Sequence, residues 1–222
     1  MVELKRTYHR TGELESEWFE INGKKEGEYK IYHYDGQLHT ICTYFDNELN
    51  GEYKTYYYDG NLDIICTFID GKIYGECKYY YENGNVRKIY TYVDGNQNGE
   101  SKEYYENGQL KEICTYLNDK KNGHYKTYYE NGQLEEMCSY IDGNINGHYK
   151  SYYSNGQLHC TCTYNDGELN DNYKLYHSNG QLYIICTYND GKSNGEYKYY
   201  NELGDLIDSF VYENDIKIKT LL

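Results

Sequence analysis

The chain has 222 residues and a surplus of acid, with 36 Asp and Glu against 22 Lys and Arg and a formal net charge of −14. Tyr is unusually frequent at 34 residues, and a mean hydropathy of −1.00 leaves no apolar run near the roughly 20 residues that cross a bilayer. A chain this acidic is repelled by nucleic-acid phosphates and by anionic lipid surfaces, so both are disfavoured as partners.

From its first residues onward the sequence repeats itself every 24 residues. One row holds glycine at Gly27, Gly51, Gly75, Gly99, Gly123, Gly147 and Gly195, with Asp171 in the remaining place; a second row holds Gly12, Gly36, Gly60, Gly84, Gly108, Gly132, Gly156, Gly180 and Gly204. A fixed period over most of a chain is the signature of a repeat architecture. We therefore expect one repeat array over residues 1–222, with capping repeats at 1–26 and 195–222.

The sequence of each 24-residue repeat predicts a β-hairpin. In the unit from Gly123 to Gly147, two Tyr-, Ile- and Thr-rich runs are separated by Glu130-Asn131-Gly132 and by Asp142-Gly143. Asn-Gly and Asp-Gly between such runs favour tight hairpin turns, since glycine accepts the positive φ they need. Proline is absent, and no window has helical periodicity. The predicted fold is all-β: an elongated, single-layer, twisted antiparallel meander of about nine tandem 24-residue hairpin repeats.

Comparing the repeats with one another separates constant rows from variable rows. A Tyr row that includes Tyr8 and Tyr32 never changes, the row that includes Tyr44 changes once to Phe68, and Leu38 and Cys42 represent two further apolar rows. We expect the constant rows to form an aromatic and aliphatic stripe. The rows that contain Ile31 and His33 vary in polarity, so we expect them on the solvated face.

The turn at the Gly36 row decides which rows share a face, because a bulge reverses the side-chain alternation that follows it. A glycine bulge would place the Tyr32, Leu38, Cys42 and Tyr44 rows on one face. A plain two-residue turn would instead pair the Cys42 row with the Tyr29 row. We favour the bulge, because it gathers the constant rows together.

The eight cysteines favour packed, reduced thiols over disulfides, metal ligands or a nucleophile. Consecutive members of the Cys42 row lie two strands apart, about 9.6 Å at the usual strand spacing, which exceeds the roughly 7 Å Cα limit for a disulfide. Tyr90 interrupts the row, as expected of an apolar position. Such thiols, with no visible secretory signal, suit a reducing cytoplasm.

Histidine and acidic residues form no recognisable catalytic or metal-binding motif. The seven histidines are scattered over different rows, and the Asp-Gly pairs lack the spacing of a calcium loop. We expect no catalytic residue, no metal site and no cofactor, and hence no enzyme.

One charged row is regular enough to bind an anionic ligand. It consists of Lys30, Lys54, Lys78, Lys102, Lys126, Lys150, Lys174 and Lys198. The simpler interpretation is that each lysine packs its stem on tyrosine rings and pairs with a carboxylate such as Glu28, Glu52 or Glu196. The alternative is a cationic track for an anionic polymer or for lipid headgroups.

The tiled motif YYENGQL…CTYxDGKxNGEYK resembles the MORN repeat family, in its variant subclass, over almost the whole chain. The resemblance implies a β-ribbon of hairpins that acts as an interaction surface and carries no catalytic residues. The Asn, Lys, Ile and Tyr bias is also similar to MORN-variant arrays of giant DNA viruses, which would place the chain in a host cytoplasm or a virion.

Three functions follow as hypotheses. The favoured one is a non-enzymatic protein–protein interaction scaffold, with a candidate binding row of His33, Tyr57, Tyr81, Tyr105, Tyr129, Tyr153 and His177. The alternative is a phosphoinositide or membrane-proximal adaptor that uses the lysine row, although the net charge disfavours it. A carbohydrate-binding module is the third. Unpaired end strands also offer a route to homodimers or end-to-end association.

Overall fold

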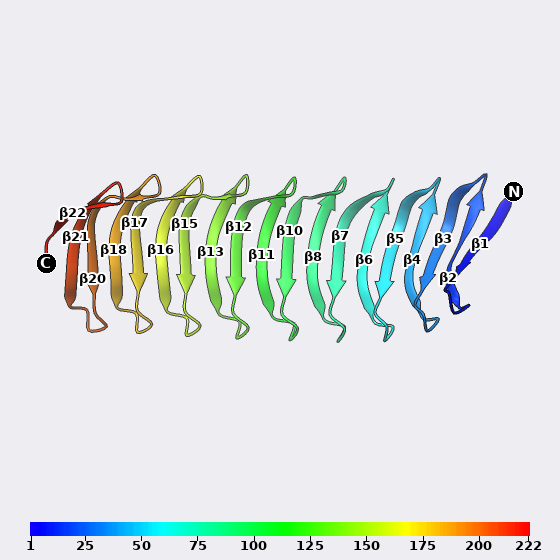
Figure 1. Ribbon diagram of the computed structural model, residues 1–222, viewed down its shortest axis with the longest axis horizontal. Helices are drawn as coiled ribbons and strands as arrows, with labels where there is room; N and C mark the ends of the chain where they lie inside the picture. Colours follow the sequence, from blue (N-terminus) through cyan, green and yellow to red (C-terminus); the bar gives the residue numbers. More distant parts are fainter. The chain divides into compact units, whose positions relative to one another are not determined.

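The computed structural model describes residues 1–222 and consists of strands and turns alone (Figure 1). The chain divides into two compact units, residues 1–108 and 109–222. Consecutive strands pair antiparallel within each unit, which confirms the predicted all-β meander of tandem hairpins. The structure contains no helix that could span a membrane.

The first unit is a meander of ten strand segments. They are β1 (Val2–Tyr8), β2 (Leu14–Ile21), β3 (Lys24–Tyr32), β4 (Leu38–Phe45), β5 (Glu48–Tyr56), β6 (Leu62–Ile69), β7 (Lys72–Tyr80), β8 (Val86–Val93), β9 (Asn96–Gln97) and β10 (Gly99–Tyr104). The short β9 and β10 both pair with β8, and the Asn98 amide between them donates to the carbonyl of Thr91 at 2.8 Å.

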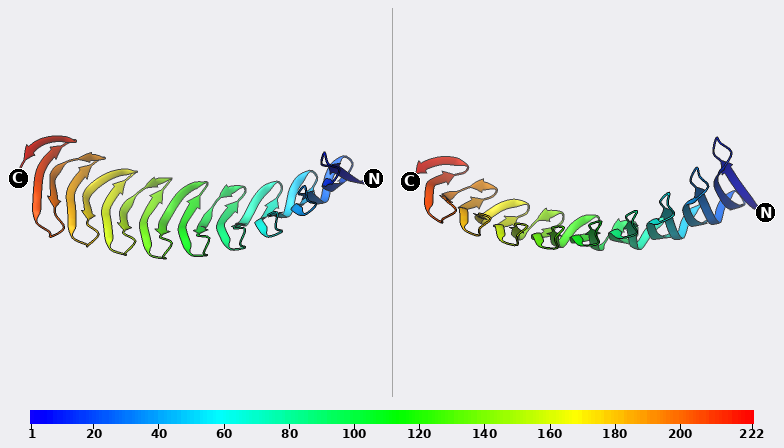
Figure 2. Two further views of the ribbon diagram at one scale, coloured as in Figure 1. Left: turned by 60° about the horizontal axis from the view of Figure 1, so that its bottom comes forward. Right: turned by 90° about the horizontal axis from the view of Figure 1, so that it is seen from below.

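The second unit repeats the same plan. It contains β11 (Leu110–Leu117), β12 (Lys120–Tyr128), β13 (Leu134–Ile141), β14 (Asn144–Ile145), β15 (Gly147–Tyr152), β16 (Leu158–Asn165), β17 (Glu168–Tyr176), β18 (Leu182–Asn189), β19 (Lys192–Ser193), β20 (Gly195–Tyr200), β21 (Leu206–Glu213) and β22 (Ile216–Thr220). Figure 2 shows that each unit is a single layer of sheet, with no second layer over either face.

The Asp-Gly positions form two-residue hairpin turns. Phe45 pairs with Glu48, and the two residues between them, Asp46 and Asn47, have φ values of 53° and 73°. Positive φ at both central positions defines a type I′ turn, whose twist matches that of the flanking strands. Asp, Asn and Gly tolerate this conformation better than other residues, which explains why they recur here.

The Gly36 row forms the other turn of each hairpin and contains the predicted glycine bulge. The His33 amide donates to the Gln37 carbonyl at 2.8 Å, and the Gly36 amide donates back to the His33 carbonyl at 2.9 Å. Gly36 has a φ of 82°, as a glycine bulge after a three-residue loop requires.

A second bulge follows three residues after Gly36, at His39, and changes which rows share a face. Tyr32 lies opposite Leu38, but Ile31 lies opposite Thr40, so His39 is an extra residue. Two bulges in one hairpin restore the original alternation.

Cross-strand partners then define the two faces of each unit. Tyr29 lies opposite Cys42, and Tyr32 lies opposite Leu38. We call the face with the Tyr29, Cys42 and Tyr44 rows the cysteine face, and the face with the Lys30, Tyr32 and Leu38 rows the lysine face. The expectation that the Tyr32, Leu38, Cys42 and Tyr44 rows share one face is therefore wrong, although the glycine bulge behind it is present.

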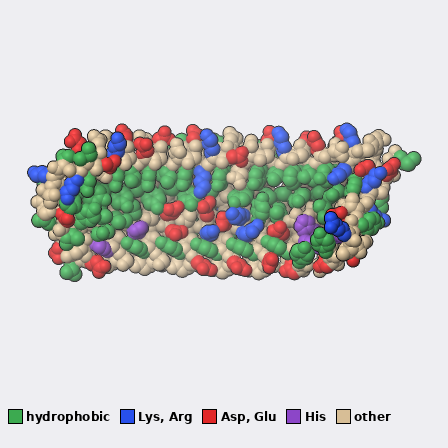
Figure 3. Space-filling model, viewed as in Figure 1, with side chains coloured by type: hydrophobic (Ala, Val, Ile, Leu, Met, Phe, Trp, Pro, Cys, Tyr) green, Lys and Arg blue, Asp and Glu red, His purple; other side chains and the backbone are tan.

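Burial is concentrated on the cysteine face, whose broad hydrophobic band is the one seen in Figure 3. Every cysteine of the chain is buried, from Cys77 at 1% exposed to Cys138 and Cys160 at 6%. The expectation that the Ile31 and His33 rows lie on a solvated face apart from the constant rows is also wrong. Both rows lie on this face, where Thr55, Ser151 and His33 are buried and the other members are half-buried.

The two expected caps correspond to the ends of the array. Residues 1–26 hold β1, β2 and the start of β3, and residues 195–222 hold β20, β21 and β22. Their capping role stays a prediction.

Candidate functional site

The candidate binding row of His33, Tyr57, Tyr81, Tyr105, Tyr129, Tyr153 and His177 lies on the cysteine face beside the Gly36-type turns. The hydroxyls of Tyr57, Tyr81, Tyr129 and Tyr153 donate to the carbonyls of Tyr80, Tyr104, Tyr152 and Tyr176 at 2.6–2.8 Å. The Nε2 atoms of His33 and His177 contact the carbonyls of Tyr56 and Tyr200 in the same way. At these six positions the row therefore joins one hairpin to the next, and its role in binding stays a prediction.

Tyrosine rings and thiols form the floor of the cysteine face. Tyr53 meets Phe68 edge to face at 5.6 Å, and Tyr173 meets Tyr188 at 5.9 Å. Burial raises the pKa of Tyr53, so its phenol stays protonated. Between Tyr29 and Tyr197 this tyrosine row changes only at Cys77 and Ser101, so most of it forms a constant platform for the residues around it.

The thiols are free, as expected, and burial raises the pKa values of Cys42, Cys114, Cys138 and Cys186 to about 11. Sequence reasoning missed one neighbour pair. Ile65 lies opposite Lys78, so Cys77 takes the place opposite Cys66 that Tyr53 has opposite Cys42. The neighbouring Cys77 thiol, together with burial, raises the pKa of Cys66. The strand register was the signal that could have found this pair.

The variable rows lie above this platform and change its chemistry along the chain. In the first unit Arg87 and Lys88 are basic, and the Lys88 ammonium lies 3.0 Å from the Glu103 carboxylate. The position of Lys88 is occupied by Glu112 one repeat later and by Glu136 two repeats later, both in the second unit. Sequence comparison singled out the Ile31 row but not the rows of Arg87 and Lys88, which meet it on the same face.

A cavity of about 350 Å³ opens on the cysteine face of the second unit. Glu136, Tyr149, Tyr164, Tyr173 and His159 are among the residues that line it, and Ser151 and Cys160 form part of its floor. These two small residues lie directly opposite each other on β15 and β16. The cavity therefore exists where the cross-strand pair has little side-chain volume.

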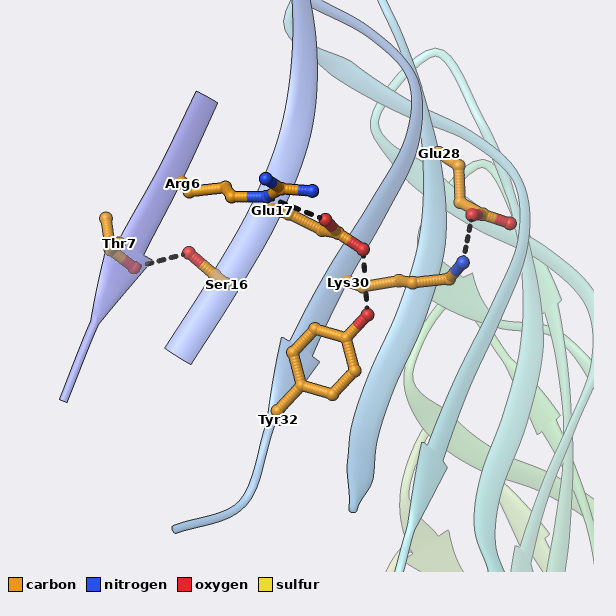
Figure 4. Close-up of polar contacts among 7 residues, drawn as sticks. All are labelled: Arg6, Thr7, Ser16, Glu17, Glu28, Lys30 and Tyr32. Atoms are coloured by element: carbon orange, nitrogen blue, oxygen red, sulfur yellow. Dashed lines mark hydrogen bonds and ion pairs between the residues drawn. The ribbon is translucent and has the colours of Figure 1, made fainter. Parts of the chain in front are cut away.

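The lysine row lies on the opposite face, and five of its members form ion pairs within their own strands. Lys54, Lys78, Lys102 and Lys198 lie 2.5–3.0 Å from the carboxylates two residues before them, and Lys30 pairs with Glu28 in the same way. Figure 4 shows the Lys30 pair beside Glu17, which accepts a 2.9 Å hydrogen bond from the Tyr32 hydroxyl. The simpler interpretation of the row, lysine paired with glutamate, accounts for these five positions.

Lys126, Lys150 and Lys174 differ from the other five. The residues two before them are His124, His148 and Asn172, so no carboxylate occupies the pairing position in these three consecutive repeats. The structure contains no group of three or more His, Cys, Asp or Glu side chains that could hold a metal ion.

Solved structures similar to this chain share little of its sequence. A chain of the TcdB2-TccC3 crystal structure is 14% identical with a TM-score of 0.24, and the match covers 99% of this chain and 14% of that one. A porin-like protein from Bacteroides uniformis is 12% identical with a TM-score of 0.25, over 99% of this chain and 93% of that one. This chain thus spans about 14% of the toxin chain that it matches. These scores are too low to carry an argument, and no curated protein matches the sequence.

A family model does match. The MORN repeat variant is found seven times in tandem, at residues 25–46, 49–70, 73–94, 97–118, 121–142, 145–166 and 172–190. The matched segments cover most of the chain, and their last residues, from 46 to 190, recur every 24 residues at the two-residue hairpin turns. The chain belongs to the MORN repeat variant family.

Proposed function

We propose that this protein is a non-enzymatic scaffold that binds a protein partner through its cysteine face. MORN-type repeats are interaction modules, and the matched repeats account for most of the described fold. The observation that carries the proposal is the arrangement of rows. Side chains that vary from repeat to repeat, such as Tyr79, Arg87 and Glu135, lie together on one face over a constant platform of tyrosine and cysteine.

Repeat proteins keep a constant framework and place specificity in variable surface positions. Tyrosine suits such a surface, because it supplies a large contact area at low cost in rotamer entropy. Charges that change from basic near Arg87 to acidic near Glu136 would let each stretch of the array select complementary groups. The binding row proposed from the sequence borders the same face, where its rings and not its hydroxyl groups would meet a partner.

A pull-down with paired variants tests the proposal. The test variant carries Arg87→Ser, Glu135→Ser and Tyr183→Ser on the cysteine face, and the control carries Lys126→Ser, Lys150→Ser and Lys174→Ser on the lysine face. The proposal expects a protein captured by the native chain to be lost with the first variant and kept with the second. A partner that the first variant keeps would contradict it.

A second candidate, an adaptor for anionic ligands, is favoured by the three lysines without carboxylate partners. His124 and His148 stand two residues before Lys126 and Lys150, where the five paired lysines of the row have a glutamate. Flotation with vesicles that contain phosphoinositides tests this candidate with the same Lys126, Lys150 and Lys174 control variant. Binding that is absent, or that the variant leaves unchanged, would exclude it.

A further inference from the structure

The chain fills one aromatic and acidic site with its own lysine. The Lys121 ammonium lies 4.0 Å from the centre of the Tyr125 ring and 5.5 Å from that of Tyr140. It also lies 3.8 Å from the Glu112 carboxylate, which accepts a 3.0 Å hydrogen bond from the Tyr125 hydroxyl. Two ring faces and a carboxylate together favour an ammonium ion.

The next repeat contains the same site without the lysine. Tyr149 and Tyr164 take the places of Tyr125 and Tyr140, with ring centres 5.9 Å apart against 5.4 Å. The Tyr149 hydroxyl donates to Glu136 at 2.9 Å, as Tyr125 does to Glu112. The residue that corresponds to Lys121 is Ile145, which pairs with Tyr140 as Lys121 pairs with Tyr116.

The site that lacks the lysine borders the cavity on the cysteine face, although Ile145 itself is not one of the residues that line the cavity. Glu136, Tyr149 and Tyr164 all line that cavity, and Tyr173 adds a further ring. Glu135 lines it as well, and neither Glu135 nor Glu136 forms an ion pair with a cation of the chain.

The electrostatics of the cavity favour a cation. Burial and the adjacent Glu136 carboxylate raise the pKa of Tyr149, so its phenol remains a neutral donor to that carboxylate. The carboxylates of Glu135 and Glu136 line the cavity, and no Lys or Arg side chain does. His159 also lines it, and its Nδ1 lies 3.2 Å from the Ser151 hydroxyl.

We propose that this cavity binds an alkylammonium group, the chemistry shared by a lysine side chain and a free primary amine. The ammonium would lie against the Tyr149 and Tyr164 rings beside Glu136, as Lys121 lies in the preceding repeat. The alkyl chain would contact the remaining tyrosines. A lysine from a protein partner would reach the site from the open side of the cysteine face, and for that source the inference rests on the proposed scaffold function.

Titration with n-butylammonium chloride, followed by two-dimensional NMR of the full chain, tests the chemistry. We expect saturable shifts at Tyr149 and Tyr173 with a millimolar dissociation constant, since so small a ligand supplies little binding energy. The neutral isostere n-butanol should give no saturable shift. Glu136→Gln, which keeps the hydrogen bond from Tyr149 but removes the charge, should weaken butylammonium binding by about tenfold.

A second variant keeps the proposal testable if Glu136→Gln disturbs the fold. Ile145→Lys supplies the lysine that the preceding repeat contains, and it should abolish butylammonium binding by filling the site. Ser193→Lys is the matched control, because it places the same charge at the corresponding position two repeats later and should leave binding unchanged. Binding that survives Ile145→Lys would overturn the proposal, as would no binding to the native chain.

A lysine-containing tripeptide blocked at both ends distinguishes the two sources. Binding of both probes would identify a lysine side chain as a suitable occupant, whereas binding of butylammonium alone would identify a free amine. The two proposals can fail independently. If a partner is captured normally by the Ile145→Lys variant but lost with the variant that carries Arg87→Ser, Glu135→Ser and Tyr183→Ser, the scaffold proposal stands and the cavity lies outside the interface.

Discussion

Tyr57→Phe tests the conclusion that the candidate binding row joins consecutive hairpins. The Tyr57 hydroxyl donates to the Tyr80 carbonyl, one repeat away, at 2.6 Å, and the substitution removes this bond while keeping the ring. A neutral hydrogen bond between partly buried groups contributes about 1 kcal/mol to the free energy of unfolding. With a urea m-value of roughly 2 kcal/mol/M, the midpoint of unfolding should fall by about 0.5 M.

The adjacent Tyr58 provides the control. It is 62% exposed, and its ring stacks on His33 with centroids 3.9 Å apart, but its hydroxyl has no hydrogen-bond partner in the chain. Tyr58→Phe should therefore leave the urea midpoint within error of the native value. Circular dichroism at increasing urea measures both variants. Equal midpoints for the two variants would refute the view that the Tyr57 hydroxyl stabilises the array.

Three further predictions concern the thiols, the alkaline limit of stability and a glycine. Titration of the denatured protein, prepared without reductant, should find eight free thiols; four or fewer would show that disulfides had formed. Burial raises the thiol pKa values of Cys42, Cys114, Cys138 and Cys186 from 9.0 to about 11, so the stability that these protonated thiols contribute is complete below pH 9 and is lost as the pH rises through 11. Urea midpoints between pH 8 and 11 should fall, and a flat profile would count against the buried thiols. Gly99 has a φ of 114°, and a Cβ there would lie 3.3 Å from that of Thr91, so Gly99→Ala should lower the free energy of unfolding by about 1–3 kcal/mol; an unchanged thermal midpoint would contradict this.

Local sequence signals were sufficient for the fold and for both turns. The 24-residue period indicated the tandem repeats. The Asp-Gly pairs and the Gly36 row occupy turn positions with backbone conformations that few residues adopt, so they predicted the hairpins and the glycine bulge correctly. The second bulge at His39 has no such signal, because that position also holds Asp63, Arg87 and Tyr183 in other repeats. Because the prediction lacked this second bulge, it placed the Cys42 row on the same face as the Tyr32 row, whereas the two rows lie on opposite faces.

The candidate sites required the register between strands. The pairing of Ser151 with Cys160 depends on both bulges of the Gly36-type turn. The pairing of Cys66 with Cys77 depends on a register shift between Ile65 and Thr67, beyond the Asp-Gly turn. The ammonium site required a further comparison, between Lys121 and Ile145 in structurally equivalent positions. The lysine row was visible in the sequence, but its ion pairs showed which three members differ.

Hydroxyl-radical footprinting of the chain, with and without its captured partner, tests the scaffold proposal most directly, because tyrosines occur on both faces and mass spectrometry reports each one. The proposal predicts that the partner protects Tyr79 and Tyr183 on the cysteine face and leaves Tyr56 and Tyr152 on the lysine face as reactive as before. Protection of Tyr56 and Tyr152 alone would contradict it and would place the partner on the lysine face.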